Sequence, residues 1–284
     1  MRLRPAWFLG LCLLALIPCG AQEQPFHFII LTDMQLGMYA SNENFIQETA
    51  NYEFAVAAVN RLKPGFVIML GDLVNKADDP AQIAEYQRIS QKIDPSIPVY
   101  HVAGNHDVGN DPTPETLASY RRSFGRDYYS FRAGPIYGIV LNSTLMHSPK
   151  NAQSEYEEQN VWLKTELAAA KASQAQHILI FQHHPCFLKD AQEDDRYENL
   201  PRERRLPLLA LFHEYGVRHV FAGHTHMNVT ASDGRLEVVA SGPVGKPLGK
   251  DGSGIRVAAV TAAGVAHRYY DFGALPEKLL VPGK

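Results

Sequence analysis

The stretch VYHVAGNHD, Val99 to Asp107, contains the two features on which the fold prediction depends. Its first five residues form a short, mainly apolar run of strand-like character. Its last four open with glycine and carry amide, imidazole and carboxylate groups. Another run, Phe66–Leu70, has the continuous apolar character of a strand buried on both faces, and Gly71-Asp72 follow it directly. We therefore predict buried strands that end in polar loops.

Strand-like and helical stretches alternate along most of the chain. The predicted strands are Phe26–Leu31, Phe66–Leu70, Val99–Ala103, Ile178–Phe181, Val217–Phe221, Leu236–Ala240, Ile255–Thr261 and Val265–Tyr269. The predicted helices are Ala50–Leu62, Ala81–Lys92, one capped by Thr113, Glu155–Lys171 and Leu206–Glu214, and Tyr128–Leu141 is a predicted hairpin that turns at Gly134-Pro135. This order predicts an α/β fold of two packed mixed β-sheets flanked by helices.

Polar groups suited to metal binding follow five of the predicted strands. They are Thr32-Asp33-Met34-Gln35, Gly71-Asp72, Gly104-Asn105-His106-Asp107, Gln182-His183-His184-Pro185 and Gly223-His224-Thr225-His226. Ligands in α/β folds collect outside the carboxyl ends of the strands, so we expect these loops to line one cleft. In extended chain, residues two apart project to the same side, which would direct Asp33 with Gln35, and His224 with His226, into that cleft. Such a mixture of ligands suits Mn, Fe or Zn.

The order of these groups resembles the signature of the calcineurin-like metallophosphoesterases, which reads D-x-H, GD, GNH followed by D or E, H, and GH-x-H. All five blocks occur in order across residues 33–226, and Gln35 replaces the histidine of the first block. Longer stretches, including TDMQLG, GNHDVGNDPTPET and EDDRYENL, are similar to the animal branch called calcineurin-like phosphoesterase domain-containing protein one. That branch is described as a serine/threonine protein phosphatase, and the likeness covers about residues 25–271.

The resemblance implies two divalent metal ions and a set of ligands for each. The first ion would be held by Asp33, Gln35, Asp72 and His226, and the second by Asp72, Asn105, His183 and His224, so that Asp72 bridges the two. The ions would lower the pKa of a shared water and neutralise the charge that develops on the phosphoryl group. His106 would then protonate the leaving group, and Asp107 is expected to orient or stabilise that imidazole.

Gln35 departs from the wider family pattern. An amide oxygen is a neutral, hard ligand, whereas imidazole is a better ligand for Zn. We therefore expect a weaker first site that favours Mn or Mg, although Fe and Zn stay open as the native ions. The alternative is that Gln35 lies at the surface or behind the ligands. Cys186 is expected to be a buried, small apolar residue and not a nucleophile.

Several further residues are candidates for contact with the substrate. His184 neighbours a predicted ligand but is one residue out of phase, so we expect it to line the pocket. Asn75 is a candidate for contact with phosphate, with loop capping as its alternative role. Residues 189–202 are too polar for the core and form either a solvated loop or a lid, in which Arg196 or Tyr197 would meet the substrate.

The first 21 residues have the layout of a secretory signal. A basic start precedes the apolar run Trp7–Ile17, and small residues lead to a predicted cleavage after Ala21. We predict a periplasmic or secreted protein with one metallophosphoesterase domain, residues 22–284, and no stable transmembrane segment after cleavage. The alternatives are a buried N-terminal helix and lipid attachment at Cys19.

The charge balance bears on the class of partner. The whole chain has 27 basic and 30 acidic residues, a net charge of −3. Residues 1–21 contain two arginines and no acidic residue, so the mature chain would have 25 basic residues against 30 acidic ones, or −5. No basic stripe is present, and nucleic-acid binding through bulk electrostatics is therefore not expected. A phosphorylated small molecule or protein is the expected partner.

The leading functional hypothesis is a phosphomonoesterase that acts on phosphoproteins or small phosphorylated molecules. A phosphodiesterase, for example one for cyclic nucleotides, is the first alternative because the same two-metal site serves both reactions. A binding module that keeps the fold without turnover is the second. A serine hydrolase is disfavoured because the chain has no G-x-S-x-G sequence.

Overall fold

The computed structural model of the protein describes residues 24–281. The strands are β1 (Phe26–Leu31), β2 (Phe66–Met69), β3 (Val99–His101), β4 (Tyr129–Ala133), β5 (Ile136–Val140), β6 (His177–Phe181), β7 (His219–Ala222), β8 (Val229–Asp233), β9 (Leu236–Ala240), β10 (Gly254–Thr261) and β11 (Gly264–Asp271). The helices are α1 (Ile46–Leu62), α2 (Pro80–Ser90), α3 (Asn105–Val108), α4 (Pro114–Phe124), α5 (Ser143–His147), α6 (Gln153–Ala172), α7 (Arg202–Tyr215) and the 3₁₀ helix η1 (Phe272–Ala274).

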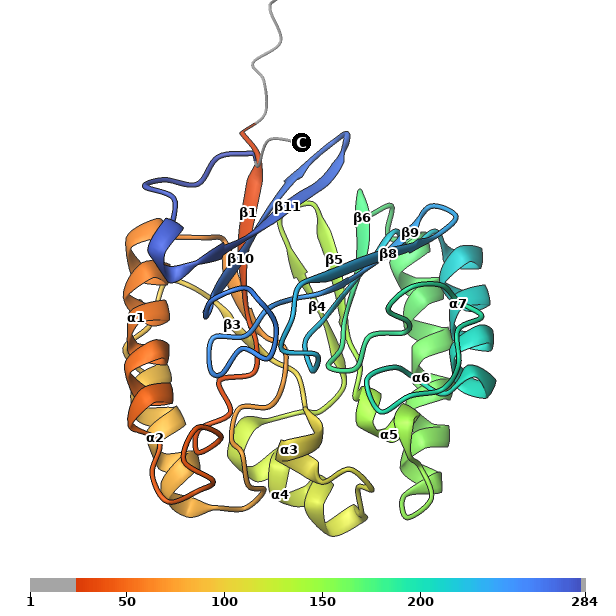
Figure 1. Ribbon diagram of the computed structural model, residues 1–284. Coiled ribbons are helices and arrows are strands. Elements are labelled where there is room, and N and C mark those ends of the chain that lie inside the picture. The colour runs from red at the N-terminus through yellow and green to blue at the C-terminus, as the bar shows by residue number, and fades with distance from the viewer. Residues whose placement is uncertain (1–23, 282–284) are drawn as a thin grey trace, which may run out of the picture.

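Two β-sheets pack face to face between helices (Figure 1). The first sheet has the strand order β11-β10-β1-β2-β3, and the second has the order β4-β5-β6-β7-β9-β8. Both sheets are mixed. In the first, β1 pairs parallel with β2 and antiparallel with β10. In the second, β5, β6, β7 and β9 run parallel, and β4 and β8 pair antiparallel at the two edges. The predicted fold class is confirmed.

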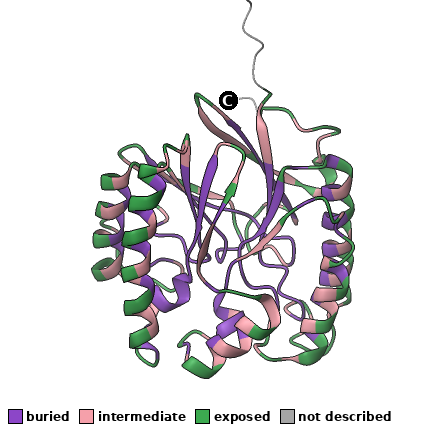
Figure 2. Ribbon diagram, turned by 180° about the vertical axis from the view of Figure 1, so that it is seen from behind, coloured by how far each residue is buried: buried purple, intermediate pink, exposed green. Residues whose placement is uncertain are grey.

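Side-chain alternation along β1 separates the layers of the core. Ile29 and Leu31 belong to a cluster that also contains Tyr52 of α1 and Tyr86 of α2. Phe28 and its neighbours on the other face belong to a second cluster, between the two sheets. A third cluster lies between the second sheet and α6 and α7. The helices accordingly present buried faces to the sheets and exposed faces to solvent (Figure 2).

Aromatic rings join the two sheets at the centre of the molecule. The ring of Phe28 stacks on Phe66 at a centroid distance of 4.8 Å. It meets Phe181 and Phe221 of the second sheet edge-on, at 5.8 and 5.7 Å. Offset-stacked and edge-to-face pairs are the favoured aromatic arrangements, so this cluster fixes how the sheets face one another.

The predicted elements are present, with differences in detail. Thr113 caps α4, since its hydroxyl accepts a hydrogen bond from the main-chain N–H of Thr116. β8 was not predicted, because it reads Val-Thr-Ala-Ser-Asp and lies at a sheet edge, where polar residues are tolerated. The short helices α3 and α5 were not predicted either, because one or two turns leave no apolar periodicity.

Within residues 24–281, no helix combines the length and the apolar character that crossing a bilayer requires. The predicted signal segment, with Cys19 and the cleavage position after Ala21, lies outside the described residues. Export therefore stays a prediction from the sequence.

We predict that Phe28→Ala lowers the free energy of unfolding by about 3–5 kcal/mol, because it removes a ring buried between both sheets. Urea unfolding followed by circular dichroism measures this in metal-free protein. The control is Val161→Ala on α6, whose side chain is 69% exposed and which should change stability by less than about 0.5 kcal/mol. Equal effects of the two variants would contradict the central role of Phe28.

Candidate metal centre

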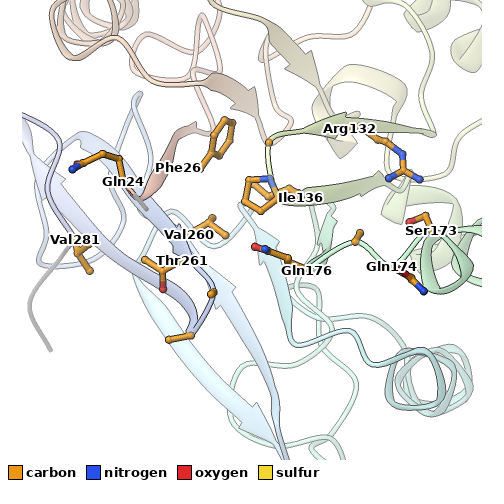
Figure 3. Close-up of a pocket in the computed structure, with 15 residues that line it drawn as sticks. Gln24, Phe26, Arg132, Ile136, Ser173, Gln174, Gln176, Val260, Thr261 and Val281 are labelled. Carbon is orange, nitrogen blue, oxygen red and sulfur yellow. The ribbon is translucent and has the colours of Figure 1, made fainter. Parts of the chain in front are cut away.

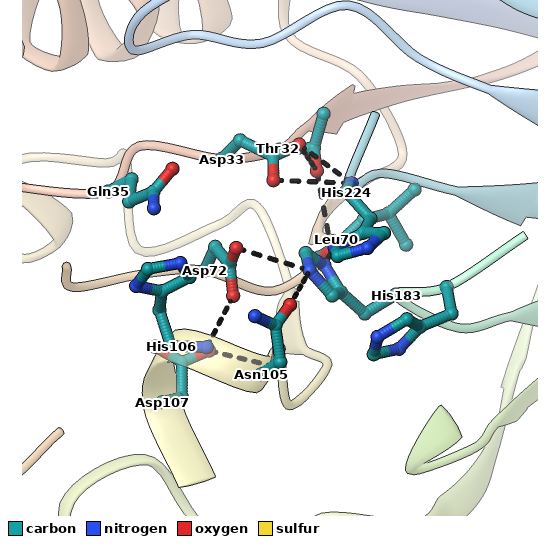
Figure 4. Close-up of polar contacts among 12 residues, drawn as sticks. Thr32, Asp33, Gln35, Leu70, Asp72, Asn105, His106, Asp107, His183 and His224 are labelled. Carbon is teal, nitrogen blue, oxygen red and sulfur yellow. Dashed lines mark hydrogen bonds and ion pairs between the residues drawn. The ribbon is translucent and has the colours of Figure 1, made fainter. Parts of the chain in front are cut away.

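All seven predicted metal ligands lie buried near the carboxyl ends of the strands. They are Asp33, Gln35, Asp72, Asn105, His183, His224 and His226. Two subsets can each hold a cation: Asp72, His183 and His224 form one, and Asp33, Asp72 and His226 form the other. The ligand atoms within each subset lie within 4.8 Å of one another. Asp72 belongs to both subsets, as a carboxylate that bridges two ions must. Figure 4 shows six of the seven side chains converging from separate loops, namely Asp33, Gln35, Asp72, Asn105, His183 and His224.

The loops approach so closely that glycine is required at their first positions. A Cβ atom added at Gly104 would overlap the main-chain nitrogen of Asp72, and one added at Gly223 would overlap the hydroxyl of Thr32. Only glycine therefore fits at these positions. Segments 30 to 190 residues apart in sequence come into van der Waals contact only because no side chain intervenes.

The extended geometry predicted for the ligand pairs is wrong. Five ligands have left-handed backbone: Asp33 (φ 51°), Gln35 (φ 41°), Asp72 (φ 49°), His224 (φ 71°) and His226 (φ 52°). This conformation costs an L-residue about 1–2 kcal/mol. Main-chain hydrogen bonds hold it in place, from Asp33 N to Gly71 O (3.1 Å) and from Gln35 N to Asp72 O (2.8 Å). Tight turns, and not extended chain, direct these side chains into the site.

Main-chain carbonyls orient each histidine of the metal centre. A carbonyl can only accept, so the ring nitrogen that contacts it must carry a proton, and only the other nitrogen can offer a lone pair to a metal ion when the ring is neutral. The pairs are His183 Nδ1 with Leu70 O (2.7 Å), His224 Nε2 with Tyr197 O (3.0 Å) and His226 Nδ1 with Lys246 O (2.6 Å). The opposite nitrogens of His183 and His226 face carboxylates: His183 Nε2 lies 3.2 Å from Asp72 Oδ2, and His226 Nε2 lies 3.5 Å from Asp33 Oδ1. Histidines that bind metals are typically oriented in this way.

The electrostatics of the site favour a cation. Burial raises the pKa of Asp33 above its usual range. Burial acts in the same direction on Asp72, but His183 outweighs it, and the pKa of Asp72 is lowered. His183 Nε2 lies 3.2 Å from Asp72 Oδ2. Burial lowers the pKa of His224 to about 3, helped by the charge of His183, so that His224 stays neutral and able to bind metal.

Gln35 supplies an independent indication that ions fit this site. Its Oε1 atom is buried and has no hydrogen-bond partner among the described residues, and Figure 4 shows its amide directed toward Asp33 and Asp72. Buried polar atoms are nearly always satisfied, so an orphaned acceptor beside two carboxylates needs a donor or a cation. The residues present therefore fit a divalent metal ion.

Comparison with known proteins agrees with this geometry. The family model described as calcineurin-like phosphoesterase matches residues 26–228. The chain belongs to the calcineurin-like phosphoesterases. This family assignment confirms the resemblance found in the sequence, and it makes the protein a metal-dependent phosphoesterase that acts on phosphorylated substrates. The family implies two divalent metal ions, for which the protein has the two candidate ligand groups.

Individual relatives match most of the chain. The protein is 38% identical over 269 residues to the serine/threonine-protein phosphatase CPPED1 of Bos taurus, and the match covers 89% of this chain and 86% of that one. It is 37% identical over 284 residues to CPPED1 of Homo sapiens, with 93% and 90% covered. A solved structure of a dimetal phosphatase from Danio rerio is 16% identical and shares the fold, with a TM-score of 0.65 over 88% of this chain and 97% of that one.

His106 lies beside the ligands, but Asp107 does not orient it. The main-chain N–H of His106 donates to Asp72 Oδ1 (2.9 Å), and its Nδ1 contacts the carbonyl of Asn75 (2.7 Å). The carboxylate of Asp107 instead accepts main-chain hydrogen bonds from Leu73, Val74 and Gly104, at 2.9, 3.2 and 2.8 Å. The predicted hydrogen-bonding role of Asp107 toward the imidazole thus belongs to Asn75, and Asp107 joins the loops after β2 and β3.

The predicted substrate contacts divide into two groups. His184 and Tyr197 lie against the metal centre: the ring centroids of His184 and His224 are 4.2 Å apart, and those of Tyr197 and His224 are 4.8 Å apart. Both ends of the Asn75 amide form hydrogen bonds within the protein, which leaves fewer N–H groups free to donate to a phosphate. Arg196 is exposed, and its guanidinium forms no hydrogen bond with another described residue.

The loop of residues 189–202 is pinned over the metal centre. The hydroxyl of Tyr197 accepts from Asn105 Nδ2 (2.9 Å), and its carbonyl orients His224. Arg205 of α7, which is fully buried, donates to the carbonyls of Ala191 (3.0 Å) and Leu200 (2.8 Å) and to that of Glu193. The role of Arg205 was not predicted, because several arginines close together on a helix are typical of a solvated face.

Two other features are not part of the metal centre. Cys186 is buried, as predicted, and burial raises the pKa of its thiol to about 12, which disfavours a nucleophilic role. A cavity of about 1110 Å³ lies near the amino-terminal end of β1, lined by residues such as Phe26, Ile136 and Val260 (Figure 3). Among residues 24–281, no histidine, cysteine or acidic residue lines it.

We predict that Arg205→Met opens the loop of residues 189–202. The change leaves one buried and two partly buried carbonyls without their donor, at a cost of up to about 1–3 kcal/mol for an unsatisfied buried group. Limited proteolysis should then cut within this loop at least about tenfold faster than in the wild type. Arg204→Met, at the adjacent and partly exposed position, is the control. Equal cleavage of both variants would mean that α7 is perturbed in general.

Proposed function

We propose that this phosphoesterase hydrolyses phosphate monoesters of alcohols, including phosphoserine and phosphothreonine in proteins. The observation that carries the proposal is the position of Asp72, which belongs to two ligand groups and also accepts a hydrogen bond from the main chain of His106. The main-chain hydrogen bond thus fixes the candidate bridging carboxylate, Asp72, relative to the candidate acid, His106. The length and identity of the match to the CPPED1 phosphatases support a phosphoprotein as one substrate.

The described residues would hold two ions. Asp33, Gln35, Asp72 and His226 would bind the first, and Asp72, Asn105, His183 and His224 the second. Two divalent ions at such a site supply Lewis-acid activation of water and neutralise charge on the phosphoryl group. The protein itself presets the ligands: the carbonyls of Leu70, Tyr197 and Lys246 fix the tautomers of the three histidines.

His106 is suited to give a proton to the leaving group. Its Nδ1 must carry a proton, because the carbonyl of Asn75 can only accept. A second proton therefore resides on Nε2 when the ring is cationic, and that proton can pass to the alkoxide oxygen as the ester bond breaks. The carbonyl of Asn75 holds the ring in place during the transfer.

The pinned loop supports discrimination among substrates. Tyr197 contacts Asn105 and His224, and the ring of His184 packs between those of His224 and His147, at centroid distances of 4.2 and 4.8 Å. A loop fixed in this position narrows the approach to the second ion. We propose that Tyr197 and His184 contact the phosphorylated side chain, while Arg196 on the exposed face of the loop contacts residues that flank it.

We predict that His106→Ala slows hydrolysis of esters with poor leaving groups about 10²–10⁴-fold, because their alkoxides need a proton. Phosphoserine peptides test this. p-Nitrophenyl phosphate, whose leaving group needs little protonation, serves as the internal control and should lose much less. Uniform loss on both substrates would contradict the assignment of His106 as the acid.

The same assay distinguishes the proposed activity from its main alternative. We expect the wild type to hydrolyse p-nitrophenyl phosphate faster than bis-p-nitrophenyl phosphate. The reverse order would identify a phosphodiesterase. Inactivity of metal-loaded protein toward both would identify a binding module.

The identity of the ions is also a proposal. One imidazole and three oxygen ligands at the first site favour Mn or Mg. We predict that Gln35→His raises the affinity of the first site for Zn relative to Mn, since imidazole is the better Zn ligand. Calorimetric titration of metal-free protein with each ion measures the ratio. An unchanged affinity and preference would show that Gln35 is not a ligand.

A further inference from the structure

A chain of four side-chain amides leads from the start of α2 to Gln35. Gln82 Nε2 donates to Asn42 Oδ1 (2.8 Å), and Asn75 Nδ2 donates to the same oxygen (2.7 Å). Gln35 Nε2 then donates to Asn75 Oδ1 (3.1 Å). Gln82 and Gln35, at the two ends, are buried, and Asn42 lies at the surface between them. The loops after β1 and β2 are thereby joined through their side chains.

Two main-chain N–H groups fix the direction of every amide in this chain. Gln82 Oε1 accepts from the N–H groups of Asn75 and Lys76, both at 2.9 Å, and a main-chain N–H can only donate. Gln82 must therefore present its nitrogen to Asn42, and Asn42 must present its oxygen. Asn75 then faces Asn42 with nitrogen and Gln35 with oxygen. The last amide, Gln35, has one orientation left: nitrogen toward Asn75 and oxygen toward the metal centre.

The loops are shaped around this chain. Asn42 has left-handed backbone (φ 70°), and its N–H donates to the carbonyl of Gly37 (2.8 Å). A Cβ atom at Gly37 would lie 2.7 Å from Gln82 Nε2 and 2.9 Å from Asn42 Oδ1, so any other residue there would push the amides apart. Asn75 also holds His106 through its carbonyl. One residue therefore positions both a candidate ligand of the first ion and the candidate acid.

We propose that Gln82, Asn42 and Asn75 are positioning residues that direct the oxygen of Gln35 at the first metal ion. A glutamine can turn either end of its amide to a site, and only the oxygen end binds a cation. The chain removes that ambiguity before any ion arrives, and the buried, unpartnered Oε1 of Gln35 is its result. The inference rests on the proposed function in one respect, namely that Gln35 binds the first ion.

Two variants that add the same negative charge test whether the direction of the amide hydrogen bonds matters. One variant reverses that direction, and the other preserves it. In Gln82→Glu, the carboxylate still accepts from the two main-chain N–H groups but cannot donate to Asn42. Asn42, Asn75 and Gln35 must then all turn over, which leaves Gln35 Nε2 facing the first site. In Asn42→Asp, the carboxylate accepts from Gln82 and Asn75 as Asn42 does, so the polarity is preserved.

Calorimetric titration of metal-free protein with Mn²⁺ is the readout, because it does not depend on turnover. We expect wild type to bind two ions. Gln82→Glu should weaken one of them about 10- to 100-fold, the usual range for residues that orient a ligand. Asn42→Asp should stay within about threefold of wild type. Gln35→Glu offers oxygen in either orientation, so adding it to Gln82→Glu should restore the lost affinity.

The outcomes distinguish a failure of the positioning role from a failure of the proposed function. Wild-type affinity in Gln82→Glu, equal losses in the two single variants, or no rescue by Gln35→Glu would overturn the positioning role. A Gln82→Glu protein that is merely destabilised would show a lowered unfolding midpoint, and restored affinity in the folded double variant would then still support the proposal. Failure of wild type itself to bind Mn²⁺ or any other divalent ion would instead refute the proposed function.

Discussion

Two carboxylates, Asp33 and Asp72, lie fully buried at the rim between two sheets, and the rest of the site depends on how this charge is compensated. Burial alone opposes the ionised form of both. The His183 ring, whose Nε2 lies 3.2 Å from Asp72 Oδ2, compensates part of this charge. A main-chain carbonyl holds each of the three imidazole rings in a fixed orientation. The arrangement is costly without a cation and favourable with one, because paired and coordinated charges are the ones that interiors tolerate. The left-handed turns and the neighbouring glycines allow these carboxylates and imidazoles to approach one another.

The sequence predicted the fold because its strands are unambiguous. Phe66–Met69 is apolar at every position, and a strand of that kind needs cover on both faces. The glycines at positions 71, 104 and 223, which follow predicted strands, each have a close neighbour from another loop that excludes a side chain. Edge strands such as β8 and helices of one turn were not predicted, because neither needs an apolar pattern.

The site was predictable in content but not in geometry. Residue types and their order identified the ligands, yet φ angles above 40° at Asp33, Gln35 and Asp72 cannot be read from alternation. Hydrogen-bond partners that come from the main chain were equally hidden. The carbonyl of Asn75 orients His106, and three N–H groups occupy Asp107, although adjacency in sequence suggested that the two side chains would pair. Main-chain partners leave no trace in residue identity, since every residue has the same carbonyl and N–H.

The place of β10 in the first sheet has a consequence for how the chain is made. β1, which leads into Asp33, is the first strand, and it pairs on one side with β2 and on the other with Gly254–Thr261. During synthesis that second neighbour emerges more than 220 residues later. Until then β1 has an open edge, and such edges favour pairing with other chains. Because contacts this distant in sequence form slowly, the nascent protein is most exposed to aggregation before its last two strands are complete.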